Sequence, residues 1–298
     1  MEGYGLQELS VQAWMQANEQ AAAELLPRLE GEQEVALLQG VLTHYPRLLT
    51  LSMLHLQPGD TVLDVGTGTG ALALDLAWGL AGEGRVMAVD IDAAGLEAAR
   101  LMAQRLRVPV ETVRGDVHDL PFQAGTFDRT VARFLLQHLK DPAKALAEMV
   151  RVTRPGGTVA VIDVDDGSLL EDPPPPPKVA ALYRAVAKLQ AMRGGDRHIG
   201  RKLYRLFRAT GLDNVSVVGI PRVQAGTPVD VRTTAVQAYH RRRLELERQA
   251  LLEAKLLTEA TYRAAMRAMD QLACEDRFAY EVEFLTTGTV PDFAKGAN

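Results

Sequence analysis

The sequence predicts an α/β fold: a doubly wound, mostly parallel sheet with helices on both faces. Between residues 61 and 164, short apolar segments suited to buried strands alternate with segments whose apolar residues recur every three or four positions. Strands that alternate with helices pair in parallel, because each helix carries the chain back to the starting edge of the sheet. The 298 residues suffice for one large domain with elaborations or for two small domains.

Seven strands are expected in this sheet. They cover residues 61–65, 85–91, 110–115, 127–133, 157–164, 214–221 and 279–288. Helices are predicted between the early strands, over residues 71–81 and 93–106. A further helix begins after the fourth strand, because Asp141 is a good N-cap and Pro142 suits the first helical turn.

The remaining segments suggest a domain division. Residues 1–55 are helical in pattern and are expected to form an N-terminal cap, while residues 56–298 form the main domain. That domain carries helical insertions at about 165–198 and 222–277. Five consecutive prolines at 173–177 fit neither a helix interior nor a central strand, so they predict an extended connector, with a ligand for a proline-binding module as the alternative.

Composition excludes several classes of protein. The net charge of −5 argues against a broad nucleic-acid footprint. Cys274 is the only cysteine, so an intrachain disulfide or a thiolate metal cluster cannot form. The start of the chain has no basic segment followed by an apolar run, and no stretch is apolar enough to cross a membrane. A cytoplasmic protein without a bound metal is expected.

A glycine-rich loop stands where the first strand passes into a helix, in "TVLDVGTGTGALALDL". Gly66, Gly68 and Ala71 fit the dinucleotide-binding pattern, and Asp90 lies about 20 residues further on, as in NAD(P)-dependent oxidoreductases. Asp64 distinguishes two cofactor classes. Its carboxylate would repel a pyrophosphate, but it would attract the ammonium group of S-adenosylmethionine.

The motifs resemble those of class I S-adenosylmethionine-dependent methyltransferases. The resemblance rests on "LDVGTGTG", "VMAVDID", "GDVHDLPF", "FDRTVARFLLQHLKDP" and "VRVTRPGGTVAVID", and it covers residues 59–164 in order. "FLLQHLKDPAKALAEMVRVTRPGG" is most similar to the ubiquinone/menaquinone-biosynthesis type of small-molecule methyltransferase. The family implies a last strand antiparallel to the others and in-line methyl transfer to an O, N or C atom of a small molecule, which leaves S-adenosylhomocysteine. A non-catalytic cofactor-binding module of the same fold is an alternative.

The resemblance also assigns cofactor-binding residues. Asp64 would hold the ammonium group, Asp90 would accept hydrogen bonds from both ribose hydroxyls, and Asp116 would accept one from the adenine amino group. The full set is Asp64, Gly66, Thr67, Gly68, Gly70, Asp90, Ile91, Asp116, Val117, Arg133 and Phe134. For the Arg133 side chain, a salt bridge to a neighbouring acid is the alternative.

Catalysis and acceptor binding have weaker signals. His138 is the candidate general base, because imidazole titrates near neutrality, with a structural hydrogen bond as the alternative. Candidate acceptor-binding residues are Tyr4, His44, Asp163, Arg197 and Arg201. Packing or capping is the alternative for the basic segment at 194–202. The basic segment at 239–249 is interpreted as an ion-paired helix surface rather than a nucleic-acid site, and the helical insertions offer a homodimer surface.

Overall fold

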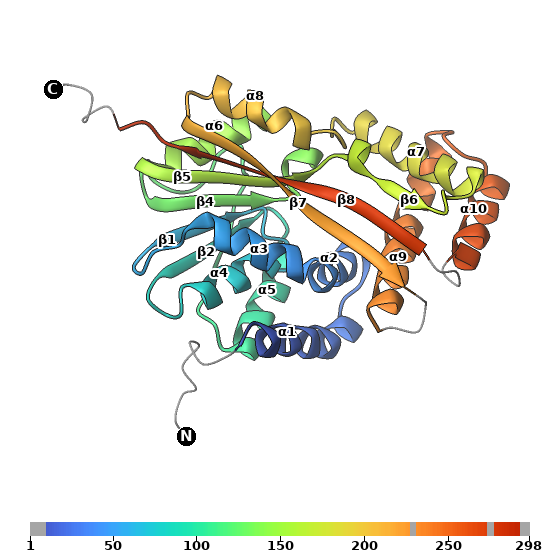
Figure 1. The fold of residues 1–298 in the computed structure, drawn as a ribbon, viewed down its shortest axis with the longest axis horizontal. Helices are drawn as coiled ribbons and strands as arrows, with labels where there is room; N and C mark the ends of the chain where they lie inside the picture. Colours follow the sequence, from blue (N-terminus) through green and yellow to red (C-terminus); the bar gives the residue numbers. More distant parts are fainter. Residues whose placement is uncertain (1–9, 227–230, 273–276, 293–298) are drawn as a thin grey trace.

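The computed structural model describes residues 10–226, 231–272 and 277–292, and a single mixed sheet crosses these residues (Figure 1). The strand order is β3-β2-β1-β4-β5-β8-β6, and β7 pairs with the other edge of β8. The strands are β1 (Thr61–Val65), β2 (Arg85–Asp90), β3 (Glu111–Arg114), β4 (Phe127–Arg133), β5 (Thr153–Val164), β6 (Leu170–Asp172), β7 (Asp213–Gly226) and β8 (Arg277–Thr289). Strands β1 to β5 pair in parallel, and β8 runs antiparallel to β5. The predicted fold class is confirmed.

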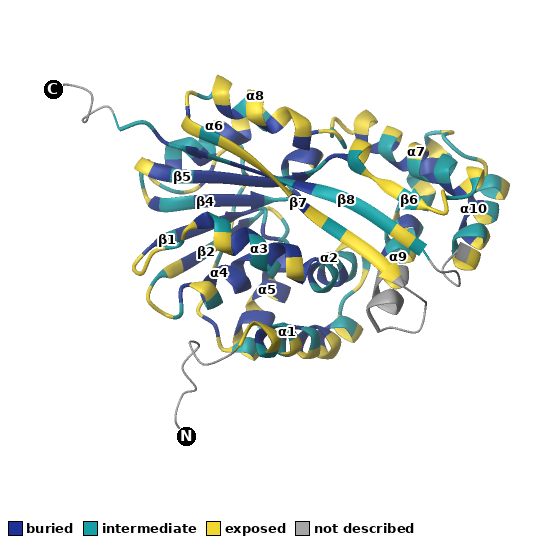
Figure 2. Cartoon of the chain, viewed as in Figure 1, coloured by how far each residue is buried: buried dark blue, intermediate teal, exposed yellow. Residues whose placement is uncertain are grey.

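Alternating side chains of the central strands enter two cores, one on each face of the sheet. Val62 packs with helices α4 (Ala71–Gly79) and α5 (Ala93–Leu106), whereas its neighbour Leu63 packs with α6 (Pro142–Val152) and α8 (Leu203–Ala209). Both side chains are fully buried, and β4 and β5 are largely dark blue in Figure 2. A strand covered on both faces reads as a continuous apolar run, which is why these strands were recognisable in the sequence.

The N-terminal segment packs on the α4 side of the sheet. It contains α1 (Val11–Leu25), the short 3-10 helix η2 (Leu26–Arg28), α2 (Gly31–Leu42) and α3 (His44–Leu54). Trp14 of α1 stacks on Trp78 of α4 with ring centroids 5.5 Å apart, and its indole N–H donates to Asp75 over 2.8 Å. The described part of the predicted cap is therefore helical and is joined to the sheet domain by apolar and polar contacts.

Three helices, α7 (Pro177–Met192), α9 (Val231–Glu253) and α10 (Glu259–Leu272), surround a third core. The core is built from Leu182, Leu189, Leu244, Leu251 and Met266. Helix α9 also packs against α2, where Gln39 donates to the Tyr239 hydroxyl over 3.1 Å. The helical insertions and the N-terminal helices thus meet through α9.

The structure corrects the predicted insertions in two places. Residues 170–172 form the short strand β6 within the segment expected to be helical, because they pair with the far end of β8. Strand β7 extends to Gly226 rather than ending at residue 221, because β7 and β8 continue as an antiparallel pair beyond the end of β5. Helix α7 begins at Pro177, the last of the five prolines, a residue type that favours the first helical turn.

Candidate functional site

The glycine loop leaves the carboxyl end of β1 and leads into α4. Gly66, Gly68 and Gly70 all have positive φ, between +54° and +85°. A Cβ at Gly66 would lie 2.7 Å from a methyl group of Leu135, and a Cβ at Gly70 would lie 2.7 Å from the Cβ of Ala99. A Cβ at Gly68 would have no neighbour within 4 Å. Gly66 and Gly70 therefore allow close packing, while Gly68 faces open space.

Asp64 lies beneath this loop as a buried carboxylate with an exposed fraction of 1%. One carboxylate oxygen accepts a 2.6 Å hydrogen bond from the Thr67 hydroxyl, and no described basic side chain forms an ion pair with it. Burial raises the pKa of Asp64 to about 7, against the lowering effect of the Thr67 hydrogen bond, and the charge of Asp90 raises it further. A cationic group placed at this loop would relieve the cost of ionising Asp64.

Asp90 and Ile91 follow β2 beside the loop. One oxygen of Asp90 accepts from the Gly68 N–H at 2.8 Å and the other from the Asp92 N–H at 2.9 Å. Each carboxylate oxygen retains a further lone pair for a ligand hydroxyl. The Ile91 side chain is 62% exposed, so it offers an apolar surface next to this carboxylate.

Asp116 and Val117 follow β3 at the same edge of the sheet. The Asp116 carboxylate accepts from the His118 backbone N–H and lies 2.9 Å from Nδ1 of the His118 ring. These contacts, the backbone hydrogen bond first, hold the pKa of Asp116 below its usual value. Val117 packs partly against the core beside Leu120. His118 was not identified from the sequence, although it stands two residues after Asp116.

Arg133 and Phe134 end β4. The Arg133 guanidinium forms a buried ion pair with Glu283 of β8, with N···O distances of 2.8 and 2.9 Å, and donates to the Thr43 hydroxyl over 3.1 Å. It also lies 3.8 Å from the centroid of the Phe134 ring. The Arg133 side chain therefore makes the salt bridge that the sequence left open as the alternative to a ligand contact.

Because β1 to β4 are parallel neighbours, their carboxyl ends meet at one edge of the sheet. The glycine loop and the residues at or after the ends of β2, β3 and β4 therefore lie side by side along this edge. The described structure brings the predicted cofactor-binding residues to one edge of the sheet. Asp64 is buried there, whereas the Ile91 side chain is largely exposed.

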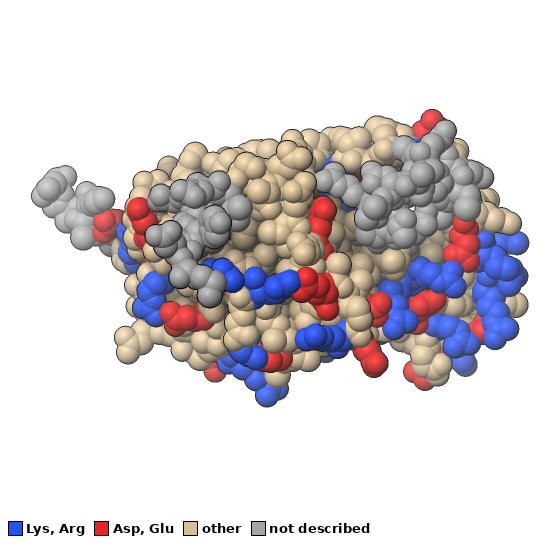
Figure 3. All heavy atoms as spheres, turned by 90° about the horizontal axis from the view of Figure 1, so that it is seen from below, with Lys and Arg blue, Asp and Glu red and all other residues tan. Residues whose placement is uncertain are grey.

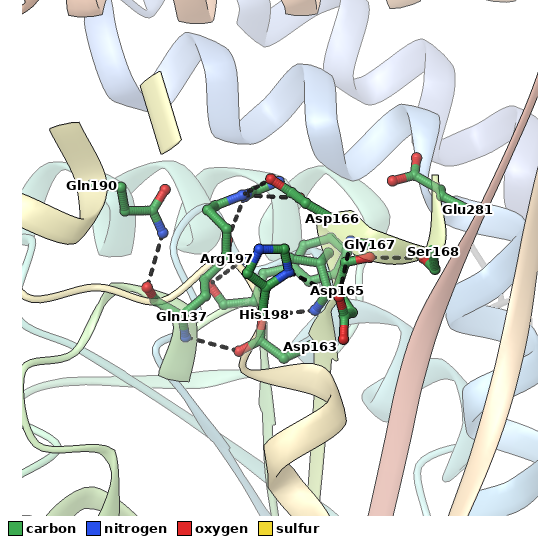
Figure 4. A network of polar contacts seen from close by, with 12 residues as sticks. Gln137, Asp163, Asp165, Asp166, Gly167, Ser168, Gln190, Arg197, His198 and Glu281 are labelled. Carbon is green, nitrogen blue, oxygen red and sulfur yellow. Dashed lines mark hydrogen bonds and ion pairs between the residues drawn. The ribbon is translucent and has the colours of Figure 1, made fainter. Parts of the chain in front are cut away.

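Acidic and basic residues form ion pairs at the end of β5 (Figure 4). Arg197 forms a 2.6 Å ion pair with Asp166, and Arg201 pairs with Asp165, which also contacts His198 at 3.0 Å. The arginine and histidine contacts outweigh burial and lower the pKa of Asp165 to about 2. The charges of Arg197 and Arg201 are thus neutralised within the protein, which favours the packing alternative over a contact with an anionic acceptor.

Asp163, near these ion pairs in β5, is fully buried. It accepts from the backbone N–H groups of Gln137 and Val164, at 3.0 and 2.9 Å (Figure 4). Burial raises the pKa of Asp163 to about 7. Its hydrogen bonds hold the 3-10 helix η3 (Leu136–His138) against the end of β5.

His44 belongs to a buried polar network at the start of α3. Its Nε2 lies 3.2 Å from Asp75, which also accepts from Arg47 at 2.7 Å and from Trp14. The His44 side chain lines a small cavity that reaches Thr69 of the glycine loop. His44 is thus buried in this network, and its contact with an acceptor stays a prediction. Tyr4 lies outside the described residues.

His138 closes η3, shortly after β4, and the residue as a whole is partly open to solvent although neighbouring groups surround its ring. Desolvation by the surrounding protein, together with the charges of Arg197 and Arg243, lowers the pKa of His138 to about 4. The ring makes no hydrogen bond with another described residue, so the structural hydrogen bond considered as an alternative is not seen. The ring is therefore neutral near pH 7 and keeps a free nitrogen, but its lowered pKa makes it a weaker base than an ordinary imidazole.

The basic segment of α9 is ion-paired at its surface. Arg241 pairs with Asp270 at 2.5 Å, Arg242 with Glu34 at 2.6 Å and Arg248 with Glu259 at 2.7 Å. On the face shown in Figure 3, Lys and Arg residues lie among Asp and Glu residues. Arg243, which the sequence grouped with these arginines, has no such pair with a described residue.

Within the described ranges, no three His, Cys, Asp or Glu side chains come together as metal ligands. No described helix combines the length and apolar character needed to span a bilayer.

The central part of the chain matches a known protein family. Residues 63–161 match the family described as "Methyltransferase domain". This match confirms, over those residues, the resemblance drawn from the glycine loop and the later motifs. The matched segment contains the glycine loop, Asp90, Asp116 and Arg133, and therefore most of the sheet edge described above.

Two curated relatives are each similar to part of the chain. An uncharacterized 37.1 kDa protein in transposon TN4556 of Streptomyces fradiae is 38% identical over 173 residues, 58% of this chain and 49% of the relative. A demethylmenaquinone methyltransferase of Oceanobacillus iheyensis is 32% identical over 122 residues, 41% of this chain and 51% of the relative. The chain thus spans about half the length of the curated relatives it matches.

Among solved structures, phosphoethanolamine N-methyltransferase 2 of Haemonchus contortus, in complex with phosphomonomethylethanolamine and S-adenosylhomocysteine, has a TM-score of 0.50 and 20% identity. The alignment covers 83% of this chain and 53% of that one. At this identity the likeness concerns the fold.

Proposed function

We propose that the chain is an S-adenosylmethionine-dependent methyltransferase that methylates an O, N or C atom of a small molecule. The observation that carries this proposal is Asp64, a buried carboxylate without an ion-pair partner among the described residues, beneath a glycine loop that faces open space at Gly68. This arrangement suits a cofactor with a cationic end and no phosphate. The domain match over residues 63–161 supports the same proposal.

The residues at the sheet edge fit the cofactor in a definite order. Asp64 would hold the ammonium group, with Gly66, Thr67 and Gly70 shaping the loop around the methionine end. Asp90 would hold the ribose hydroxyls with its remaining lone pairs. Ile91, Asp116 and Val117 would surround the adenine, and the backbone of Arg133 and Phe134 would lie near the methionine end.

When bound, the cofactor supplies a methyl group on a positively charged sulfur, which is a good leaving group. The protein then contributes mainly by positioning the acceptor and excluding water. The neutral His138 ring at the end of β4 would accept a proton from an O–H or N–H acceptor as that atom is methylated. Asp163 would keep η3, and hence His138, in place through the Gln137 backbone.

The helical segments suggest how an acceptor is enclosed. We propose that residues 1–55 form a cap on the main domain, residues 56–298, and that the insertions at about 165–198 and 222–277 cover the acceptor. The contacts between α2 and α9 support this arrangement. A small-molecule acceptor, a cytoplasmic location and a homodimer remain predictions. The arginines of α9 that are paired with acidic side chains argue against a nucleic-acid partner.

Direct titration calorimetry tests the proposal. S-adenosylmethionine or S-adenosylhomocysteine is expected to bind with micromolar affinity, and Asp90→Ala is expected to weaken this binding at least about 100-fold, or ~2.7 kcal/mol. Asp213→Ala, at the exposed start of β7, is the matched control and should change nothing. Tight NADH binding without either sulfur-containing ligand would support the oxidoreductase instead. If the cofactor binds but none of a diverse set of acceptors is methylated, the result would favour the non-catalytic module.

A further inference from the structure

Helix α9 bridges the N-terminal helices and α7. On one side the Tyr239 hydroxyl accepts from Gln39 of α2 at 3.1 Å. On the other side the rings of His240 and Tyr183 of α7 meet edge to face, with centroids 6.3 Å apart. Two helical turns further, Glu247 pairs with Arg193, just beyond the end of α7, at 2.9 Å. The α9 surface between these contacts faces both neighbouring helices.

Arg243 occupies this surface of α9. It follows Tyr239 by four residues and His240 by three, and it precedes Glu247 by four, spacings that place residues on one side of a helix. Burial lowers the pKa of His138 in η3 and of His240, and the charge of Arg243 adds to both effects; the same charge opposes the burial that raises the pKa of Tyr183 in α7. The guanidinium is thus close enough to act electrostatically on η3, which follows β4 at the proposed cofactor edge, and on α7.

Arg243 differs from the other arginines near this position. Arg197 pairs with Asp166, Arg222 with Glu281 and Arg277 with Glu171. Among the described residues, Arg243 has neither a carboxylate partner nor a hydrogen bond, although its side chain is only partly exposed. Partial burial of an unpaired charge costs free energy, and a bound anion would offset that cost.

A second polar group beside Arg243 also lacks a partner. The Nδ1 atom of His240 is buried and has no hydrogen-bond partner among the residues that the structure describes. Burial, with the charge of Arg243 next in effect, lowers the pKa of His240 to about 3, so the ring is neutral. The rings of Tyr183 and Tyr239 flank it, the latter with centroids 5.1 Å apart. An unsatisfied nitrogen among aromatic rings suits a ligand that is both polar and aromatic.

We propose that Arg243 binds a carboxylate of the methyl acceptor, and that Tyr183, Tyr239 and His240 pack around an aromatic ring carrying that carboxylate. A guanidinium presents two parallel N–H groups that match the two oxygens of a carboxylate. Arg243 is then a specificity residue, which selects charged aromatic acceptors without touching the transferred methyl group. This inference rests on the proposed methyltransferase function and names its acceptor class.

The test measures charge selectivity by direct binding. Protein saturated with S-adenosylhomocysteine is titrated with benzoate, 4-hydroxybenzoate and 2-naphthoate, each compared with its neutral primary amide. At least one acid is expected to bind ten or more times tighter than its amide. Arg243→Met should reduce that preference to within about twofold, because the methionine keeps the apolar stem and loses the charge. Arg248→Met, on the same helix but paired with Glu259, should retain the full preference.

The outcomes separate this inference from the proposed function. If no acid binds better than its amide, or if Arg243→Met keeps the preference, the role of Arg243 is refuted while the cofactor proposal stands. If S-adenosylhomocysteine itself fails to bind the unaltered protein, the proposed function fails first. Circular dichroism and the affinity for S-adenosylhomocysteine confirm that the variant is folded, and Arg243→Gln repeats the test if the methionine variant is not.

Discussion

At the scale of single residues, buried charges divide into those with a partner in the protein and those without one. Arg133 and Glu283 neutralise each other in the interior, as do Arg47 and Asp75. Asp64 and Arg243 have no opposite charge bonded to them among the described residues. Since a buried charge without compensation is costly, such residues mark positions where a ligand completes the structure.

The raised pKa of Asp64 predicts that cofactor binding depends on pH. With a pKa of about 7, the free protein holds Asp64 mostly protonated at pH 5.5. Only the carboxylate attracts the ammonium group, so the affinity for S-adenosylmethionine should fall roughly 10- to 20-fold between pH 7 and pH 5.5. Calorimetry at several pH values measures this decrease and the proton released on binding.

Asp64→Asn provides the control for this pH dependence. The amide cannot ionise, so the variant should bind more weakly at pH 7 and show little change in affinity down to pH 5.5. An unchanged pH profile in Asp64→Asn would assign the titration to a different group and refute the role given to Asp64.

The position of Arg243 is testable through its histidine neighbours. Removing its positive charge favours the imidazolium form, so Arg243→Met should raise the pKa of both His138 and His240 by several tenths of a unit or more. NMR titration of the histidine ring protons measures both values. Arg248→Met is the control and should shift neither; equal values in Arg243→Met and the unaltered protein would contradict the assigned contacts.

At the scale of elements, the site depends on how tightly neighbouring elements approach one another. The glycine loop touches α5 and the segment after β4 at distances that leave no room for a Cβ at Gly66 or Gly70. The end of β4 is joined to the middle of β8 by the buried pair of Arg133 and Glu283. Both contacts hold the carboxyl edge of the sheet in shape.

The glycine loop predicts a marked difference between two glycine variants. Gly70→Ala forces a Cβ to 2.7 Å from Ala99 at a φ of +85°, and it should destabilise the protein by about 2–4 kcal/mol and weaken cofactor binding. Gly211→Ala has a similar φ of +79° but no neighbour within 4 Å, so about 1 kcal/mol is expected. Urea denaturation compares the two; equal losses would contradict the steric explanation.

Removing one partner of the buried ion pair between β4 and β8 should strongly destabilise the protein. Arg133→Met leaves Glu283 buried without its main partner and should cost about 3–5 kcal/mol of unfolding free energy. The double variant Arg133→Met, Glu283→Met should recover part of this loss, because no isolated charge remains. Breaking the exposed pair of Arg85 and Glu111 serves as the comparison and should cost at most about 1 kcal/mol. Denaturant titration distinguishes these cases.

At the scale of the whole molecule, two cores flank the sheet and a third core holds the α7, α9 and α10 helices together. The third core shares no buried residue with the other two. Its connections to the rest of the protein run through α2 and through the polar contacts of Gln190 with Gln137. The proposed acceptor-binding helices are therefore able to loosen without disrupting the cofactor edge.

This arrangement predicts local rather than global loosening when the third core is weakened. Leu251 is fully buried there, and Leu251→Ala should cost about 2–5 kcal/mol. Hydrogen exchange should increase in α7, α9 and α10 while α4 and α5 stay protected, and the affinity for S-adenosylhomocysteine should change less than twofold. Leu146→Ala, in the core beside α6, is the control and should increase exchange across the sheet domain.

Sequence patterns predicted the elements whose buried side chains leave a recognisable apolar pattern within a short segment of the chain. Strands β1 and β2 are short, largely apolar segments, and β4 mixes apolar and polar residues. Asp141 caps α6 through the Lys144 N–H as its residue type suggests. The strand at residues 170–172 was missed, because "LED" has no apolar alternation and is a strand only through pairing with β8. The far end of β7 was missed for the same reason.

The sequence by itself determined the α/β fold and the edge of the sheet at which a cofactor is proposed to bind, because the glycines, the strand ends and Asp64 follow one another along the chain. Only the tertiary structure decided which charges are paired. Arg241, Arg242 and Arg248 meet acids, one of them Glu34 in a helix some 200 positions away, whereas the neighbouring Arg243 meets none among the described residues. The physical reason is that ion pairing depends on distance in space, and consecutive positions of a helix face different neighbours.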